Sequence, residues 1–163
     1  MSKINIRKAT EADFHSIWEI YQEIITARDT YSNYENTTKE DAHTKWMDEE
    51  THTYVATMDN TVVAAYLLKA NWLGYGDHVA NASFIVSSKH RGNGIGKLLG
   101  QHALATSRTL KFEAIQFNYV ISSNLPAVEL WKSLGFNIIG VVPKGYRNSN
   151  DERIDVYIMH RFL

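Results

Sequence analysis

A glycine-rich segment at residues 91–97, RGNGIGK, is the part of this sequence best suited to bind a charged ligand. Glycine allows a tight turn and the close approach of a ligand, and the first amides of a helix are unpaired at the positive end of its dipole. Such amides bind phosphate oxygens, and Lys89, Arg91 and Lys97 add positive charge beside them. The segment predicts a phosphate-binding turn. In the alternative interpretation, its glycines only shape the chain and its basic side chains are solvated.

Two common nucleotide-binding motifs do not match this segment. A P-loop needs an earlier glycine at a fixed distance and a hydroxyl residue after its Gly-Lys pair, but Arg91 and Leu98 occupy those positions. A dinucleotide-binding GxGxxG motif fails because its last position falls on Lys97 or Leu99. Both motifs are therefore excluded at this turn.

Other residue types argue against thiol or metal chemistry. The chain has no cysteine, which excludes disulfides, thiolate metal sites and a cysteine nucleophile. The seven histidines stand far apart, and no pair has the HxxxH spacing that places two ligands on one helical face. We therefore expect no metal site.

The composition indicates one globular domain over residues 1–163. A hydrophobic share of 44% and a charged share of 21% are globular values, and no apolar run is long enough to span a membrane. A formal net charge of −1 gives no global field that would attract nucleic acid or an anionic membrane. Because the first residues lack a secretory signal pattern, we expect a cytoplasmic protein.

The first half of the chain is predicted to form two helices and three strands. The predicted elements are a strand containing Ile4 and Ile6, a helix from Thr10 to about Thr26, a more exposed helix at 39–50, and strands at 53–58 and 61–68. A polar, tyrosine-rich loop at 28–38 separates the helices and is available to line a pocket. Asp59 and Asn60 suit a two-residue hairpin turn.

The second half alternates strands and helices around the glycine-rich turn. The predicted elements are a strand at 79–86, a helix at 95–110, a strand at 114–120, a helix capped by Asn124 and ended by Gly135, and strands at 136–142 and 153–160. Strand, helix and strand in this order imply a parallel pair with a right-handed crossover. The fold class is therefore α/β or α+β, around one mixed sheet.

Two motifs in this order resemble those of the GNAT superfamily of acetyl-CoA-dependent N-acetyltransferases. The first is Arg or Gln, two residues, Gly, one residue, and Gly or Ala, which Arg91, Gly94 and Gly96 satisfy. The second is Asn-x-x-Ala, a helix and a Gly-Phe pair, which is met by Asn124, Ala127, Gly135 and Phe136. The match is densest over residues 79–139, and the flanking elements agree in type and order only.

The resemblance implies a mostly antiparallel sheet of six to seven strands with about four helices. Its central parallel pair, the fourth and fifth strands, should splay apart around the pantetheine arm of acetyl-CoA. The resemblance carries the cofactor-binding role onto Ile85, Val86, Arg91, Gly92, Asn93, Gly94, Ile95, Gly96, Lys97 and Asn124. The amides from Gly92 to Lys97 should hold the pyrophosphate.

Family members transfer acetyl directly to a primary amine, which first has to lose a proton. Many relatives carry a glutamate on the fourth strand, where this chain has Asn81, which cannot act as a base near neutral pH. Asn81 can still position water or substrate, and the base is then His78, Asp77 or solvent.

Relatives also often carry a tyrosine in the helix after Asn124, as proton donor to the leaving thiolate. Trp131 stands there, and its indole does not titrate usefully, so we favour a core-packing role for it. Tyr119 or Tyr146 can substitute as the acid, or the thiolate leaves unprotonated.

The acceptor site implied by the resemblance lies between two loops. These are residues 28–38 with Tyr31 and Tyr34, and residues 144–152 with Tyr146 and Arg147. Their side chains suit the carboxylate and side chain of an amino acid, with ordinary surface residues as the alternative.

The expected activity is acetylation of a small-molecule amine such as an amino acid or an analogue. Acetylation of a protein or peptide is the second hypothesis. A non-catalytic acyl-CoA sensor is the third, because Asn81 and Trp131 replace residues that titrate in relatives. No nucleic-acid or membrane partner is expected, and the resemblance leaves a homodimer open.

Overall fold

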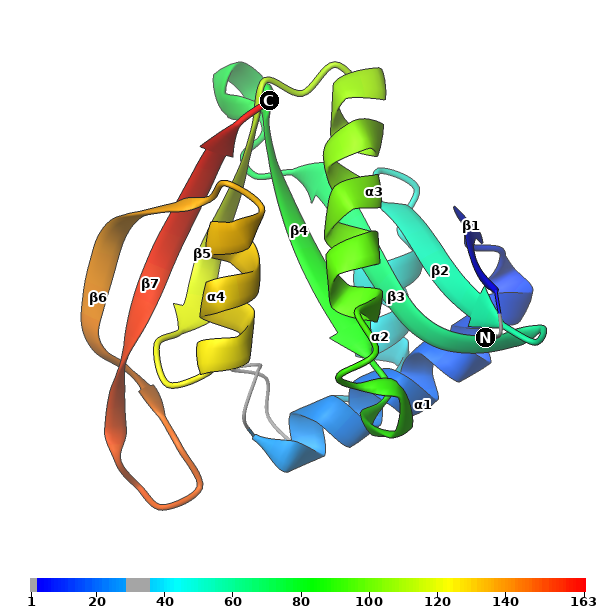
Figure 1. The fold of residues 1–163 in the computed structure, drawn as a ribbon, viewed down its shortest axis with the longest axis horizontal. Coiled ribbons are helices and arrows are strands. Elements are labelled where there is room, and N and C mark those ends of the chain that lie inside the picture. The colour runs from blue at the N-terminus through cyan, green and yellow to red at the C-terminus, as the bar shows by residue number, and fades with distance from the viewer. Residues whose placement is uncertain (1–2, 29–35) are drawn as a thin grey trace.

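A computed structural model of the chain describes residues 3–28 and 36–163, whose strands form one seven-stranded sheet (Figure 1). The strands are β1 (Ile4–Lys8), β2 (His52–Met58), β3 (Thr61–Ala70), β4 (Val79–Val86), β5 (Ala114–Ile121), β6 (Asn137–Arg147) and β7 (Arg153–Phe162). The α-helices in these residues are α1 (Phe14–Ala27), α2 (Lys39–Met47), α3 (Ile95–Thr109) and α4 (Leu125–Ser133). The sheet order is β1-β2-β3-β4-β5-β7-β6, antiparallel except for β4 and β5. The predicted fold class and its central parallel pair are confirmed.

The helices cover the two faces of the sheet in pairs. One core joins α1 and α2 to alternate residues of β2, β3 and β4, including Val55, Leu67 and Ile85. The other joins α3 and α4 to the opposite face, through residues such as Leu99 and Trp131. Because side chains alternate along a strand, successive residues of β4 point into different cores.

The element boundaries depart from the sequence predictions at a few ends. The first helix starts as a 3₁₀ turn at Glu11–Asp13 before α1 begins. The second helix ends at Met47 because Asp48 leaves the helical region, and it buries Ala42 and Trp46 although it was expected to be more exposed. The predicted turn at Asp59 and Asn60 is confirmed by φ angles of 50° and 63°.

Asp13 ties β1 to the start of α1. Its carboxylate accepts hydrogen bonds from the Thr10 amide and from both terminal nitrogens of Arg7, each at 2.8 Å. These bonds hold the pKa of Asp13 well below its usual range, chiefly through Arg7.

The parallel strands β4 and β5 separate almost as soon as they pair. Their register consists of Val79 with Ala114 and Ala80 with Ile115. Just beyond, the side-chain nitrogen of Asn81 donates to the carbonyl of Gln116 at 3.0 Å. From there the strands diverge and open a gap within the sheet, as the resemblance led us to expect (Figure 1).

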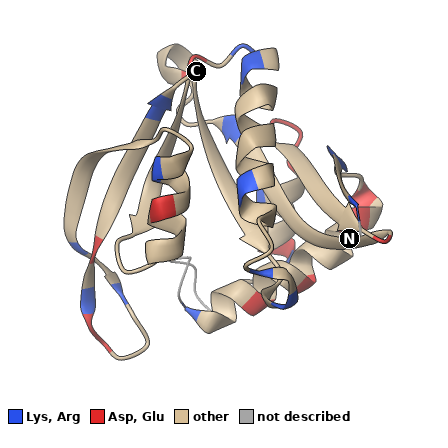
Figure 2. Cartoon of the chain, in the orientation of Figure 1, with Lys and Arg blue, Asp and Glu red and all other residues tan. Residues whose placement is uncertain are grey.

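Charged residues are unevenly placed around one end of this gap. Basic residues mark the turn before α3 and the start of α3, and acidic residues lie on the neighbouring α1 (Figure 2). The two elements are joined where the Ser88 amide donates to a carboxylate oxygen of Glu23 at 2.9 Å. The glycine-rich turn is thereby anchored from α1.

Candidate functional site

Two cavities lie along the gap and share part of their lining. The gap cavity, about 320 Å³, is lined by Lys45, Asn81, Ala82, Ser83, Phe84, Phe117, Asn118, Tyr119, Val120, Ile121, Asn124, Ala127 and Trp131. The loop cavity, about 880 Å³, lies against the glycine-rich turn, α1 and the start of α4. Both are lined by Phe84, Asn124 and Ala127. The two cavities are therefore neighbours at these three residues.

The glycine-rich turn has the backbone that its sequence predicts. Gly92 and Gly94 have φ angles of 78° and 75°, a region that other residues rarely adopt. A Cβ atom added at either position would meet no atom within 4 Å, so the surrounding space is open to a ligand. At the start of α3, the Leu98 amide donates to the Gly94 carbonyl. The amides that precede Leu98 have no carbonyl one turn earlier within the helix to which they could donate.

His90 lines the loop cavity, although one of its ring nitrogens is turned away from solvent. Its Nδ1 atom is buried and has no hydrogen-bond partner among the residues that the structure describes. The same residue lines the loop cavity together with Arg91 and Lys97. The positive charge of Arg91 and Lys97 on this cavity fits an anionic ligand group.

Most of the predicted cofactor-binding residues come together on this cavity. It is lined by Val86, Arg91, Gly92, Gly94, Ile95, Gly96, Lys97 and Asn124. Ile85 and Asn93 do not line it: Ile85 is buried in the α1 core, and the Asn93 side chain donates to the His90 carbonyl at 3.3 Å. Asn124 also caps α4, since its side chain accepts from the Ala127 amide at 3.4 Å.

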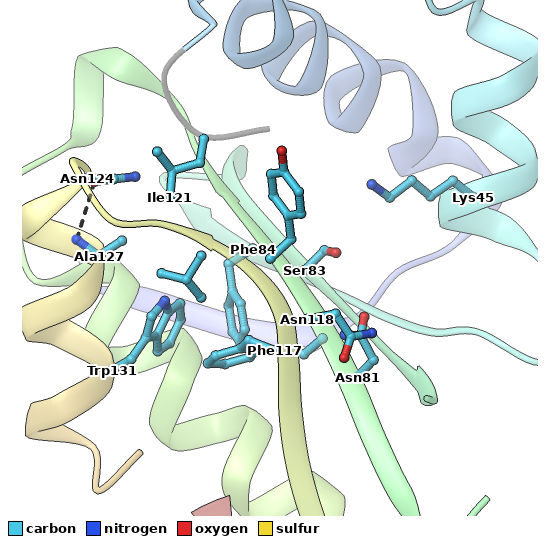
Figure 3. A pocket seen from close by; sticks show the side chains of 13 residues that line it. Lys45, Asn81, Ser83, Phe84, Phe117, Asn118, Ile121, Asn124, Ala127 and Trp131 are labelled. Atoms are coloured by element: carbon cyan, nitrogen blue, oxygen red, sulfur yellow. Dashed lines mark hydrogen bonds between the residues drawn. The ribbon is translucent and has the colours of Figure 1, made fainter. Parts of the chain in front are cut away.

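The gap cavity has an aromatic side and a polar side (Figure 3). Trp131 packs 4.8 Å from Phe84 and 4.6 Å from Phe117, measured between ring centroids. Trp131 is buried, as its expected packing role requires, yet it also lines the cavity. On the other side, the cavity is lined by Asn81 of β4 and Asn118 of β5.

Lys45 reaches toward the polar side of the gap cavity from α2 (Figure 3). Its Nζ atom donates to the Tyr21 hydroxyl at 3.3 Å and lies 5.0 Å from the centroid of that ring. Burial, with a smaller contribution from Lys69, lowers the pKa of Lys45 to about 8. Lys45 is thus a half-buried amine at the cavity wall.

The predicted catalytic and acceptor-binding residues separate in the structure. Asn81 lines the gap cavity, and Tyr146 lines the loop cavity while donating a hydrogen bond to the Arg28 carbonyl. His78 and Arg147 are exposed and line neither cavity; Arg147 lies 3.6 Å from Asp151 instead. The geometry gives no support to the roles expected for those two residues. Tyr31 and Tyr34 lie outside the described residues.

Sequence reasoning missed Lys45, Ser83 and Asn118. One available signal was the position of Lys45 next to Trp46 on a helix with a buried face. Asn118 had no such signal, because it belongs to an irregular part of β5 and receives its position from Asn71, to which it donates at 2.6 Å.

The described part of the chain has neither a metal-binding cluster nor a membrane-spanning helix. No three or more His, Cys, Asp and Glu side chains there are grouped in a way that would hold a metal ion. No helix within residues 3–28 and 36–163 combines the length and apolar character needed to cross a membrane.

Three named proteins from other organisms are similar in sequence. The N-acetyltransferase aca1 of Schizosaccharomyces pombe is 31% identical over 99 residues, which cover 60% of this chain and only 47% of that protein. YwnH of Bacillus subtilis, a phosphinothricin acetyltransferase by name, is 27% identical over 98% of this chain and 99% of its own. The L-amino acid N-acetyltransferase AaaT of Escherichia coli is 26% identical over 99% of each chain.

Solved structures show the same architecture over the whole chain. A GCN5-related N-acetyltransferase from Kribbella flavida has a TM-score of 0.94 and 37% identity, covering 98% of both chains. A phosphinothricin acetyltransferase from Sinorhizobium meliloti, solved in complex with AcCoA, has a TM-score of 0.89 and 21% identity, covering 100% of this chain and 89% of its own. Residues 14–136 match the sequence model of the "Acetyltransferase (GNAT) family". The chain therefore belongs to the GNAT acetyltransferase family.

Proposed function

We propose that this N-acetyltransferase uses acetyl-CoA to acetylate the amine of a small molecule, an amino acid or an amino-acid analogue. The observation that carries the proposal is that the loop and gap cavities are neighbours and share Phe84, Asn124 and Ala127 in their lining. One cavity suits a diphosphate, and the other is lined largely by aromatic and amide side chains. A thioester held in the first therefore faces an acceptor held in the second.

Residues of the loop cavity would hold the diphosphate end of acetyl-CoA. The open backbone at Gly92 and Gly94 leaves room for phosphate oxygens near the α3 amides, and Arg91 and Lys97 supply positive charge. Bound acetyl-CoA supplies the acetyl group as a thioester.

Residues of the gap cavity would orient the acceptor and exclude bulk water. Phe84, Phe117 and Trp131 form an apolar wall on the side of α4. Asn81 lines the opposite side, where its amide is held by Gln116. Among the described residues that line the cavity there is no carboxylate or histidine, so we propose water as the acceptor of the amine proton.

The sequence relatives support a small acceptor. YwnH and AaaT, which match this chain over nearly their full lengths, are named for phosphinothricin and L-amino acids. The gap cavity volume of about 320 Å³ is at the small end of known ligand sites, roughly 300–1,000 Å³. An amino acid fits such a volume better than a folded protein does.

A thiol-release assay tests the proposal directly. The purified chain is incubated with acetyl-CoA and a panel of the twenty L-amino acids, phosphinothricin, spermidine and short peptides, and free CoA is detected with a thiol reagent. Because the chain has no cysteine, the protein adds no thiol background. We expect turnover with at least one amino acid or phosphinothricin. Turnover with peptides alone, or acetyl-CoA binding without turnover on any amine, would contradict the proposal.

A further inference from the structure

We propose that Asn81 binds the acceptor amine through its side-chain oxygen, Oδ1, so that the amine reacts from its neutral form and gives no proton to Asn81. This inference rests on the proposed function, because it assigns a group to the acceptor end of the same site. Asn81 lies on β4 and lines the gap cavity but not the loop cavity. Its role is therefore separable from the binding of acetyl-CoA.

The orientation of the Asn81 carboxamide follows from the group that it contacts. The Gln116 carbonyl can only accept a hydrogen bond, so the Asn81 atom 3.0 Å from it has to be the donor, Nδ2. No described residue donates to the other end of the amide, Oδ1, and this atom is not buried. A hydrogen-bond acceptor thus remains available where Asn81 lines the gap cavity.

A chain of hydrogen bonds supports this amide from the neighbouring strands. Gln116 pairs with His160 of β7, and its side-chain Nε2 donates to Oδ1 of Asn118 at 2.9 Å. Nδ2 of Asn118 donates in turn to Oδ1 of Asn71, which directly follows β3, at 2.6 Å. A group that is held in this way loses little freedom when it binds a ligand, so Oδ1 of Asn81 is a preorganised acceptor.

An amide oxygen suits a neutral amine because it carries no charge. A neutral amine offers N–H groups to Oδ1 and a lone pair to the thioester, whereas an ammonium ion has no lone pair. A carboxylate would stabilise the ammonium ion, but an amide exerts no such attraction between charges. The titratable groups that face Asn81 are Lys69, its pair on β3, Lys45 of α2 and Tyr119 of β5. None of these three is anionic near neutral pH, so they do not favour the ammonium form either.

Strand β4 leads from the shared lining of the two cavities to Asn81 (Figure 3). Residues 81–84 all line the gap cavity, and Phe84 also lines the loop cavity. At about 3.3 Å per residue, Asn81 lies about 10 Å along the strand from Phe84. An acetyl group that enters from the side of Phe84 therefore approaches an amine held at Asn81 along the same strand.

The pH dependence of the wild type provides the first test. kcat/KM is measured for an accepted amino acid and for its fluorinated derivative, whose amine has a lower pKa. Because the neutral amine is the reacting species, we expect the midpoint of the kcat/KM profile to fall at the pKa of each free acceptor, and to shift between the two by the difference of their pKa values. The same midpoint for both acceptors would assign the proton to a group of the enzyme and overturn the proposal.

Variants of Asn81 test whether this residue contacts the amine. Asn81→Ala removes Oδ1 and should lower kcat/KM by about tenfold or more. Asn81→Asp puts a carboxylate beside the bound amine and stabilises its ammonium form, so the midpoint of the kcat profile should rise by about one pH unit or more. Asn5→Ala and Asn5→Asp, the same changes at an exposed position of the remote strand β1, are the controls and should behave as wild type.

A purely structural role of Asn81 gives a different result. Loss of the bond to Gln116 changes the stability of the protein, but it does not move the ionisation of a bound amine. The assays are therefore run under conditions in which unfolding curves show each variant to be folded. An unchanged kcat midpoint in folded Asn81→Asp would overturn the proposed contact.

The outcomes separate this inference from the proposed function. Acetyl-CoA affinity is measured by calorimetry, and folded Asn81 variants should bind it as the wild type does. A wild type that acetylates an amine with a midpoint independent of the acceptor refutes the role of Asn81 alone. A wild type that fails to bind acetyl-CoA, or that acetylates no amine, refutes the proposed function and this inference with it.

Discussion

Asn81 illustrates how a single residue can serve the architecture at a position where relatives often use a base. Its side-chain N–H group donates to the Gln116 carbonyl directly after the last residue pair of β4 and β5. That carbonyl has lost its partner on β4 because the strands diverge. A glutamate or aspartate, being an acceptor when ionised, cannot make this bond.

Replacing Asn81 with Asp is therefore expected to destabilise the protein. The Asn81→Asp variant should lose about 1–3 kcal/mol of unfolding free energy at pH 7, because the Gln116 carbonyl then faces a carboxylate. The loss should shrink at acidic pH, where the protonated carboxyl group of the variant can donate. Denaturant unfolding at pH 7 and pH 4.5 checks this, and equal losses at both pH values would contradict it.

Gly94 contributes by having no side chain, which leaves space open for a ligand. Gly94→Asp should weaken acetyl-CoA binding by about tenfold or more, because it puts a negative side chain into the space proposed for the diphosphate. Gly74→Asp is the matched control: Gly74 has a similar φ angle of 70° and equally open surroundings, but lines neither cavity. Calorimetry with both variants separates backbone strain from ligand repulsion, and similar affinities of the two would argue against the proposed binding turn.

At the scale of elements, α3 and α4 approach each other closely where Gly100 faces Leu134 and Trp131. A methyl group at Gly100 would overlap Leu134 and lie 3.3 Å from Cζ3 of Trp131. Gly100→Ala should therefore destabilise the protein by about 1–3 kcal/mol, even though alanine favours helices. Gln101→Ala, on the exposed face of the same helix, should change stability little. Urea unfolding of the two variants tests this, and a stabilised Gly100→Ala would contradict the packing.

The junction of β1 and α1 predicts a pH-dependent contribution to stability. The pKa of Asp13 is lowered in the folded state, so its stabilising effect is complete above the unfolded pKa of about 3.9 and is lost as the pH falls below it. Asp13→Asn should be less stable than the wild type at pH 7, and the difference should narrow by pH 3. Asp41→Asn, at the similar but exposed cap of α2, should have a smaller effect. A difference for Asp13→Asn that stays constant with pH in chemical unfolding would rule this out.

Sequence patterns predicted the helices and strands well. They predicted the site only where its residues lie near one another in the sequence. The glycine-rich turn, the Asn124 cap and the order of strands and helices follow from residues near one another in the sequence. Lys45 and Asn118 could not be found in this way, because α2 and the irregular part of β5 reach the cavity through tertiary packing. His78 and Arg147 line neither cavity. Spacing along the sequence does not show on which side of the gap the segment that carries each residue lies.

The molecule as a whole consists of two sheet portions joined at one corner. Strands β1 to β4 form one portion and β5, β7 and β6 the other; β4 and β5 pair over two residues, the Asn81–Gln116 and Asn118–Asn71 bonds lie nearby, and the chain crosses between the portions through α3. The proposed ligand binds between these portions and contacts both.

Acetyl-CoA should therefore protect both sides of the gap from hydrogen exchange. We expect slower amide exchange in residues 81–86 and 116–121 when acetyl-CoA is added, because a ligand bridging the portions suppresses their local opening. Strands β1 and β2, remote from the gap, should exchange as before. Exchange measured by mass spectrometry gives the answer, and protection confined to the glycine-rich turn would show that the ligand does not enter the gap.

Trp131 is a fluorescent side chain next to the residues that the two cavities share. Its indole lines the gap cavity and packs against Phe84, which lines both cavities. The polarity around an indole ring sets its emission wavelength, so filling this space would alter the intrinsic fluorescence without any added dye. The enzyme thus carries a built-in reporter at the point where donor and acceptor are proposed to meet.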